Sequence, residues 1–196
     1  MILKKVRLFF SVMAIMAFTT GATIRRTFVA ITPDSSLYIK GTTYVNTFSC
    51  RFDVENINNP VHVDYYKEGN RIKFDETALV LNVDCFDCGG RGINRDLRDI
   101  LKSEEQPHIF LFLKEIKPIE STAAYKAVLD IEIAGETNTY EVPVEVEKNN
   151  KLLIKGDLNI SLPDHNIAAP SKLFGLINIH ENVEISFKLG VKEIRN

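Results

Sequence analysis

Apolar and polar residues alternate one by one along much of the chain. The alternation is cleanest in residues 140–147, and it returns in residues 152–162 and 183–192. Residues 126–133 and 43–54 follow the same pattern. A period of two places all the apolar side chains on one face of a β-strand. The pattern therefore predicts antiparallel strands, each with one dry face and one wet face.

Short polar segments separate these strands at hairpin intervals. Residues 134–138 and 148–150 link three successive strands, and residues 67–70 precede a further run over residues 71–83. Short connections make neighbouring strands antiparallel. About eight strands are predicted in this way, and closing such a sheet on itself removes its edges. We therefore expect residues 23–196 to form one mainly β domain, an eight-stranded antiparallel β-barrel.

One segment departs from the strand pattern and predicts a short helix over residues 93–103. Asn94 is the candidate N-cap, and Pro107 prevents the helix from continuing. The strand at residues 109–116 is apolar on both faces, so we expect the helix to cover its outer face. Apolar side chains recur in the helix at spacings of three and four, at Ile93, Leu97, Ile100 and Leu101.

The first 22 residues form a pattern of their own. Lys4, Lys5 and Arg7 precede an apolar stretch at residues 8–18, and small residues follow at positions 20–22. This order is typical of a secretory signal peptide. An uncleaved anchor is the alternative, although the stretch is short for a membrane span of about 20 residues. We expect cleavage of this segment and a periplasmic or secreted mature protein.

Composition and charge exclude one class of partner. Hydrophobic residues make up 45% and charged residues 26% of the chain, as in ordinary globular proteins. The formal net charge is -2, and losing the three basic residues of the signal peptide leaves -5. Nucleic-acid binding needs clustered Lys and Arg. No nucleic-acid partner is therefore expected.

The chain has three cysteines, Cys50, Cys85 and Cys88. In an oxidising compartment they can form at most one internal disulfide. We favour a structural disulfide between Cys50 and either Cys85 or Cys88. Cys85 and Cys88 also have C-x-x-C spacing, so a thiol redox protein using this pair is an alternative function. The pair ends a strand and precedes two glycines, however, whereas a thioredoxin-like motif begins a helix.

No motif indicates catalysis or a metal site. The four histidines are dispersed without metal-ligand spacing, and we interpret them as solvated or loop residues. G-x-S-x-G, H-E-x-x-H and glycine-rich phosphate loops are missing from the sequence. We therefore expect neither an enzyme nor a bound metal or cofactor.

The apolar inward positions are the remaining candidates for function. An eight-stranded barrel encloses either packed side chains or a cavity for one small ligand. The alternation fits both a structural barrel with a filled core and a hollow barrel that holds an apolar ligand. The candidate ligand-binding positions are Tyr44, Phe48, Phe52, Leu129, Ile131, Val142, Val144, Leu158, Ile160, Ile185 and Phe187.

Several segments, taken in order, resemble the YceI-like family, particularly its Bacteroidetes-type members. They cover most of the chain after the signal peptide. The segments are Ser36–Thr43, Val45–Cys50, Phe86–Gly89, Asn94–Leu97, Leu101–Ser103, Pro107–Ile109, Tyr140–Val144, Phe174–Ile177 and Val183–Ile185.

This resemblance implies a lipocalin-like barrel in the periplasm. Its interior would bind an apolar isoprenoid-type lipid or quinone without catalysis, and peripheral membrane contact would fit such a role. Better-known members often carry a histidine in the helix motif, but Leu97–Leu101 has none. The resemblance therefore implies no histidine contact to a lipid head group at this position.

Overall fold

The computed structural model describes residues 23–43, 47–168, 171–172, 177–178 and 180–194. The predicted signal peptide and Tyr44 lie outside these residues. Within them, no helix is long and apolar enough to cross a membrane. The strands are β1 (Arg25–Ile31), β2 (Ser36–Thr42), β3 (Thr47–Phe52), β4 (Val61–Glu68), β5 (Arg71–Asp75), β6 (Ala78–Asn82), β7 (Phe86–Asp87), β8 (His108–Pro118), β9 (Tyr125–Ile133), β10 (Glu136–Lys148), β11 (Leu152–Ser161), β12 (Ser171–Lys172), β13 (Ile177–Asn178) and β14 (Asn182–Ile194). The helices are α2 (Arg91–Ile100) and the short 3-10 helices η1 (Val54–Asn56), η2 (Val83–Cys85) and η3 (Leu162–His165).

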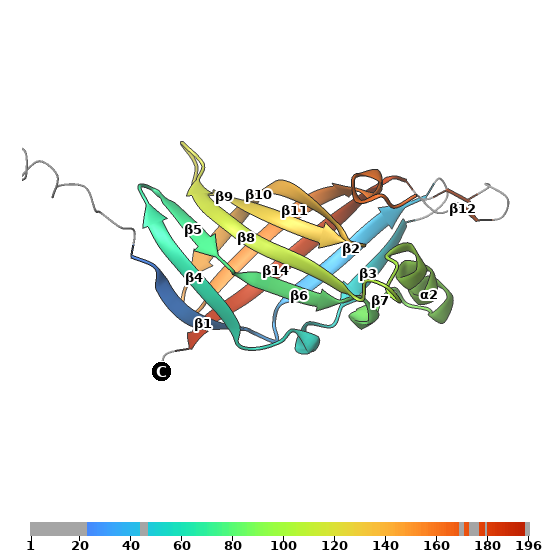
Figure 1. The fold of residues 1–196 in the computed structure, drawn as a ribbon, viewed down its shortest axis with the longest axis horizontal. Coiled ribbons are helices and arrows are strands. Elements are labelled where there is room, and N and C mark those ends of the chain that lie inside the picture. Colours follow the sequence, from blue (N-terminus) through green and yellow to red (C-terminus); the bar gives the residue numbers. More distant parts are fainter. Residues whose placement is uncertain (1–22, 44–46, 169–170, 173–176, 179, 195–196) are drawn as a thin grey trace, which may run out of the picture.

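The main sheet closes on itself (Figure 1). From β1, successive hydrogen-bonded neighbours are β4, β5, β8, β9, β10, β11 and β14, and β14 pairs again with β1. These pairings are antiparallel. β6 also pairs with β8, and β2, β3 and β7 extend the sheet from β14. The described sheet thus has 12 strands, and the predicted eight-stranded barrel is its closed circuit.

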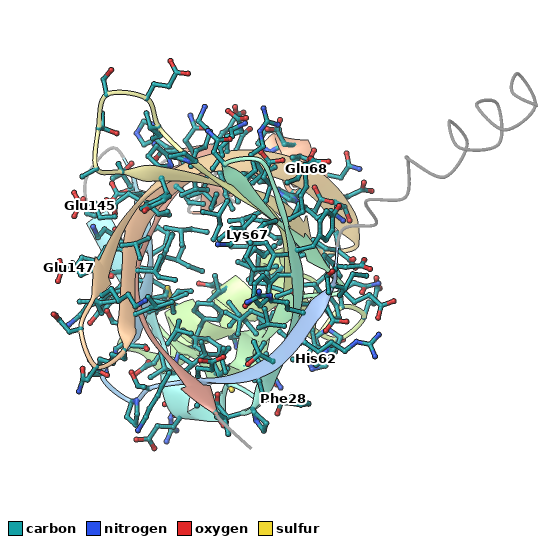
Figure 2. The ribbon with its side chains drawn as sticks, turned by 90° about the vertical axis from the view of Figure 1, so that its left-hand side faces the viewer. Phe28, His62, Lys67, Glu68, Glu145 and Glu147 are labelled. Carbon is teal, nitrogen blue, oxygen red and sulfur yellow. A yellow bond between two sulfur atoms is a disulfide. The ribbon has the colours of Figure 1, made fainter. Side chains whose placement is uncertain are left out.

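Strand alternation separates the inner and outer faces of the barrel. Figure 2 shows Lys67 of β4 pointing toward the middle of the ring, whereas Glu68, Glu145 and Glu147 point outward. Because neighbouring residues on a strand point to opposite faces, Val146 between those two outward positions on β10 faces inward, and so does Val144. The inner face is therefore the apolar face that the alternation predicts.

One end of the barrel is filled with packed side chains. η2, β7 and α2 gather at this end, beside β3 (Figure 1). The rings of Phe52 and Phe86 meet edge to face there, with centroids 5.0 Å apart. Both side chains are buried, as are Val83 and Leu101 in the same cluster. We call this region the filled end.

The helix differs from the prediction in extent and in position. It spans Arg91–Ile100 and begins after Gly90 rather than at an Asn94 cap. The Asn94 Oδ1 instead accepts a hydrogen bond from the Cys88 N–H, at 2.7 Å. Because the short β7 ties the preceding chain to β3, the helix lies at the filled end and not over β8 (Figure 1). Its side chains Leu97 and Ile100 pack on the core there.

The outer face of β8 stays apolar without the predicted helix over it. Phe110 and Phe112 stack on each other at 5.9 Å between centroids and are partly buried.

The strand predicted over residues 71–83 is interrupted, since Glu76 adopts a φ of 48° between β5 and β6. The two resulting strands, β5 and β6, each pair with β8.

An ion pair ties the bend between β1 and β2 to the turn before β11. The Lys151 Nζ lies 2.6 Å from the Asp34 Oδ2. This hydrogen bond, with a second from Thr32, lowers the pKa of Asp34 to about 2. A carboxylate with a lowered pKa stabilises the fold above its ordinary pKa, and that contribution is lost as the pH falls through the folded value.

We therefore expect Lys151→Met to flatten the acid dependence of stability between pH 3.8 and about 2. Urea unfolding across this window is the measurement. The midpoint should fall less steeply on acidification in Lys151→Met than in the wild type. Lys148→Met removes a nearby cation that makes no ion pair within the described chain, and it is the control. Equal slopes in all three proteins would contradict the prediction.

Candidate functional site

The inner faces of β9, β10, β11 and β14 form a continuous apolar wall. Phe187 on β14 lies against Gly156 on β11, where an added Cβ would come within 2.7 Å of the phenyl ring. Glycine therefore makes room for this ring. The wall centres on the buried residues Ala127, Val142 and Val144, packed against Leu113, Ile116, Leu129, Tyr140, Val146, Ile154, Leu158 and Phe187.

Several side chains of this wall are not fully covered by protein. Leu129, Leu158 and Ile185 face inward but remain partly exposed, whereas Val142 is 0% exposed. In a filled core, inward side chains pack at crystal-like density and lose contact with solvent. The partial exposure therefore indicates that side chains do not fill the ring at this level. We call this space the lumen.

The structure divides the predicted interior positions into groups. Leu129, Leu158, Ile185 and Phe187 border the lumen. The side chains that face the same way and are buried are Ile131, Val142, Val144 and Ile160. Phe52 belongs instead to the filled end, and Phe48 packs on the core cluster that includes it. Ligand contact by any of these residues stays a prediction.

Charged residues stand on the inner face near the other end of the barrel, which we call the open end. Lys67 points toward the middle of the ring there (Figure 2). Arg25 pairs with the inward Tyr65, and Lys148 shares the inner face of β10. All three cations are exposed, and none makes an ion pair within the described residues. The lumen thus has a polar rim opposite the filled end.

One buried polar contact joins the inner face of β10 to η3. The Tyr140 Oη is 2.8 Å from the His165 Nε2, and the His165 Nδ1 is 2.9 Å from the Glu136 carbonyl oxygen. His165 is 0% exposed, so its interpretation as a solvated or loop histidine is wrong. Burial raises the pKa of Tyr140, with a smaller contribution from Asp164, and the side chain stays a neutral phenol.

Cys50 and Cys88 form a disulfide, and Cys85 is free. The β3–β7 register pairs Phe52 with Phe86, which places Cys50 opposite Cys88. This is one of the two pairings that the sequence left open, and it leaves Cys88 unavailable to Cys85. Burial raises the pKa of the Cys85 thiol, which favours the less nucleophilic protonated form. The geometry therefore adds no support for thiol redox chemistry.

Comparisons with known proteins relate this barrel to one family. Residues 35–191 match the model of the YceI-like domain. The crystal structure of BcnA from Burkholderia cenocepacia is similar with a TM-score of 0.64 and 17% identity, covering 83% of this chain and 99% of that protein. A polyisoprenoid-binding domain from Saccharophagus degradans, implicated in plant cell wall breakdown, gives a TM-score of 0.57 and 12% identity, covering 88% and 100%. At these sequence identities, the two structural comparisons show a shared fold. A search of curated sequences gave no match.

Proposed function

The chain belongs to the YceI-like family, and from this premise we propose that it binds an isoprenoid-type lipid or quinone inside the barrel. It acts as a binding or carrier protein and not as an enzyme. The similar fold of a polyisoprenoid-binding domain supports the choice of ligand class. The pattern of the first 22 residues and the Cys50–Cys88 disulfide support a periplasmic location, since disulfides persist in oxidising compartments.

The observation that carries this proposal is the incomplete burial of inward apolar side chains. Leu129, Leu158 and Ile185 leave apolar surface facing the lumen. Covering that surface with a hydrocarbon chain contributes about 25 cal/mol for each Å² removed from water. The filled end blocks one side of the barrel, so the ligand enters past the polar rim at the open end. Catalytic groups are not required for such binding.

The test is lipid capture by the mature protein. Native mass spectrometry of protein purified gently from its host should show a bound isoprenoid lipid. A lipid added at about 100 times its Kd should stabilise the fold by ~2.7 kcal/mol, a rise in Tm of about 5–10 °C for a domain of this size. A barrel that is always empty and shows no shift with polyprenols or quinones would instead favour the filled structural barrel.

A further inference from the structure

The proton positions of the Tyr140–His165 pair follow from its partners. The Glu136 carbonyl oxygen accepts only, so the His165 Nδ1 that contacts it carries the proton and donates. A neutral imidazole carries one ring proton, and the Nε2 must therefore accept. The hydroxyl of Tyr140 donates to that nitrogen at 2.8 Å. Its single hydrogen is then committed, while its oxygen keeps acceptor capacity.

Neighbouring contacts hold this pair in place. The Asn138 Nδ2 donates to the Asp164 carbonyl oxygen at 2.7 Å, and the Asn166 Nδ2 donates to the Glu136 Oε1 at 2.8 Å. Both bonds fasten the chain around η3 onto β10. The imidazole and phenol planes lie 14° apart, with ring centroids 6.0 Å from each other. The orientation of the Tyr140 oxygen is thus set by protein contacts before any ligand enters.

Tyr140 itself reaches the lumen wall. It stands on the inner face of β10, two residues before Val142 and opposite Leu129 on β9. It packs with both core clusters and stays partly exposed, whereas its hydrogen-bond partner His165 is fully buried. The wall residues around it, Leu129, Val142 and Leu158, are apolar. Tyr140 therefore offers a hydrogen-bond acceptor among these apolar side chains, and the adjacent inward residue of β10, Asn138, is already bonded to the Asp164 carbonyl oxygen.

We infer that Tyr140 accepts a hydrogen bond from the inner end of the bound lipid, so that the lumen selects hydroxyl-terminated isoprenoids, alcohols or quinols. A carbonyl, carboxylate or ether end cannot donate to this oxygen and would lose its bonds to water without replacement. This inference rests on the proposed function and specifies the ligand end that the site recognises.

The test compares geranylgeraniol with its methyl ether, which has the same chain but cannot donate. Affinities for the mature protein are measured by displacement of a fluorescent fatty alcohol. The alcohol should bind about tenfold more tightly, as expected for one buried hydrogen bond. In Tyr140→Phe this preference should disappear. Tyr125→Phe, which removes a phenol from the inner face at the open end, should keep it.

Equal binding of alcohol and ether by the wild type, or a preference that survives in Tyr140→Phe, would overturn the inference. If neither compound binds, the proposed function fails instead. Nitrogen-15 NMR of wild-type His165 gives a second readout that needs no variant. A proton on Nδ1 and a bare Nε2 are expected, and a proton on Nε2 would overturn the inference even if lipids bind.

Discussion

Leu158→Trp is expected to weaken isoprenoid binding strongly while the barrel stays folded. Leu158 lies on the inner face of β11, borders both core clusters and remains partly exposed at the lumen. An indole at this position would occupy space that a lipid chain needs. Excluding about four methylene groups, at ~0.8 kcal/mol each, costs ~3 kcal/mol of binding free energy. We therefore expect affinity to fall about a hundredfold, measured by fluorescent lipid displacement.

The neighbouring residue provides a matched control for this variant. Asn159 is exposed and points outward on the same strand. Asn159→Trp adds an indole to β11 outside the barrel and should bind lipid as the wild type does. A filled core would respond differently, because overpacking at residue 158 would cost about 1–3 kcal/mol of stability. A strongly lowered Tm, or unchanged lipid affinity, in Leu158→Trp would contradict the hollow barrel.

The strands were predictable because their pattern depends on the backbone alone. A period of two in residues 140–147 fixes which side chains share a face, and neighbouring strands with short connections must pair. The helix was harder to place. An apolar stripe through Leu97 and Ile100 shows that something covers the helix, but not what. The surface that α2 packs on is set by β7 and the disulfide, which hold the chain before the helix at the filled end.

The sequence predicted which side chains of the candidate site face the barrel interior, but not which of them are fully buried and which border the lumen. Val142 and Leu158 follow the same alternation, yet the first is 0% exposed and the second is partly exposed. The difference depends on how many strands surround the axis and on what fills each end. The burial of His165 was also not predictable from the sequence. Its partner Tyr140 lies 25 residues earlier, and the two meet only because η3 folds onto β10. The inward position of Lys67 could have been predicted, since the alternation along β4 places its side chain on the inner face.

Removing the disulfide is expected to have the largest effect on stability. Cys50 and Cys88 are 38 residues apart, and the loop that they close includes β4, β5 and β6. The chain-entropy relation gives ~4 kcal/mol for a loop of this length. Cys50→Ala with Cys88→Ala should therefore lower Tm by about 10 °C, measured by thermal unfolding under oxidising conditions. Cys85→Ala removes the free thiol and should change Tm little.

The wild type in reductant separates the lost cross-link from lost packing. Only two residue pairs, Arg51 with Asp87 and Phe52 with Phe86, join β3 to β7 in the described sheet. The Asp53 N–H also donates to the Cys85 carbonyl oxygen, at 2.9 Å, so the disulfide reinforces a short ladder. Reductant should therefore lower the wild-type Tm nearly to that of the double variant and leave the double variant unchanged. A double variant as stable as the oxidised wild type would mean that packing of Phe52 on Phe86 suffices to hold the filled end.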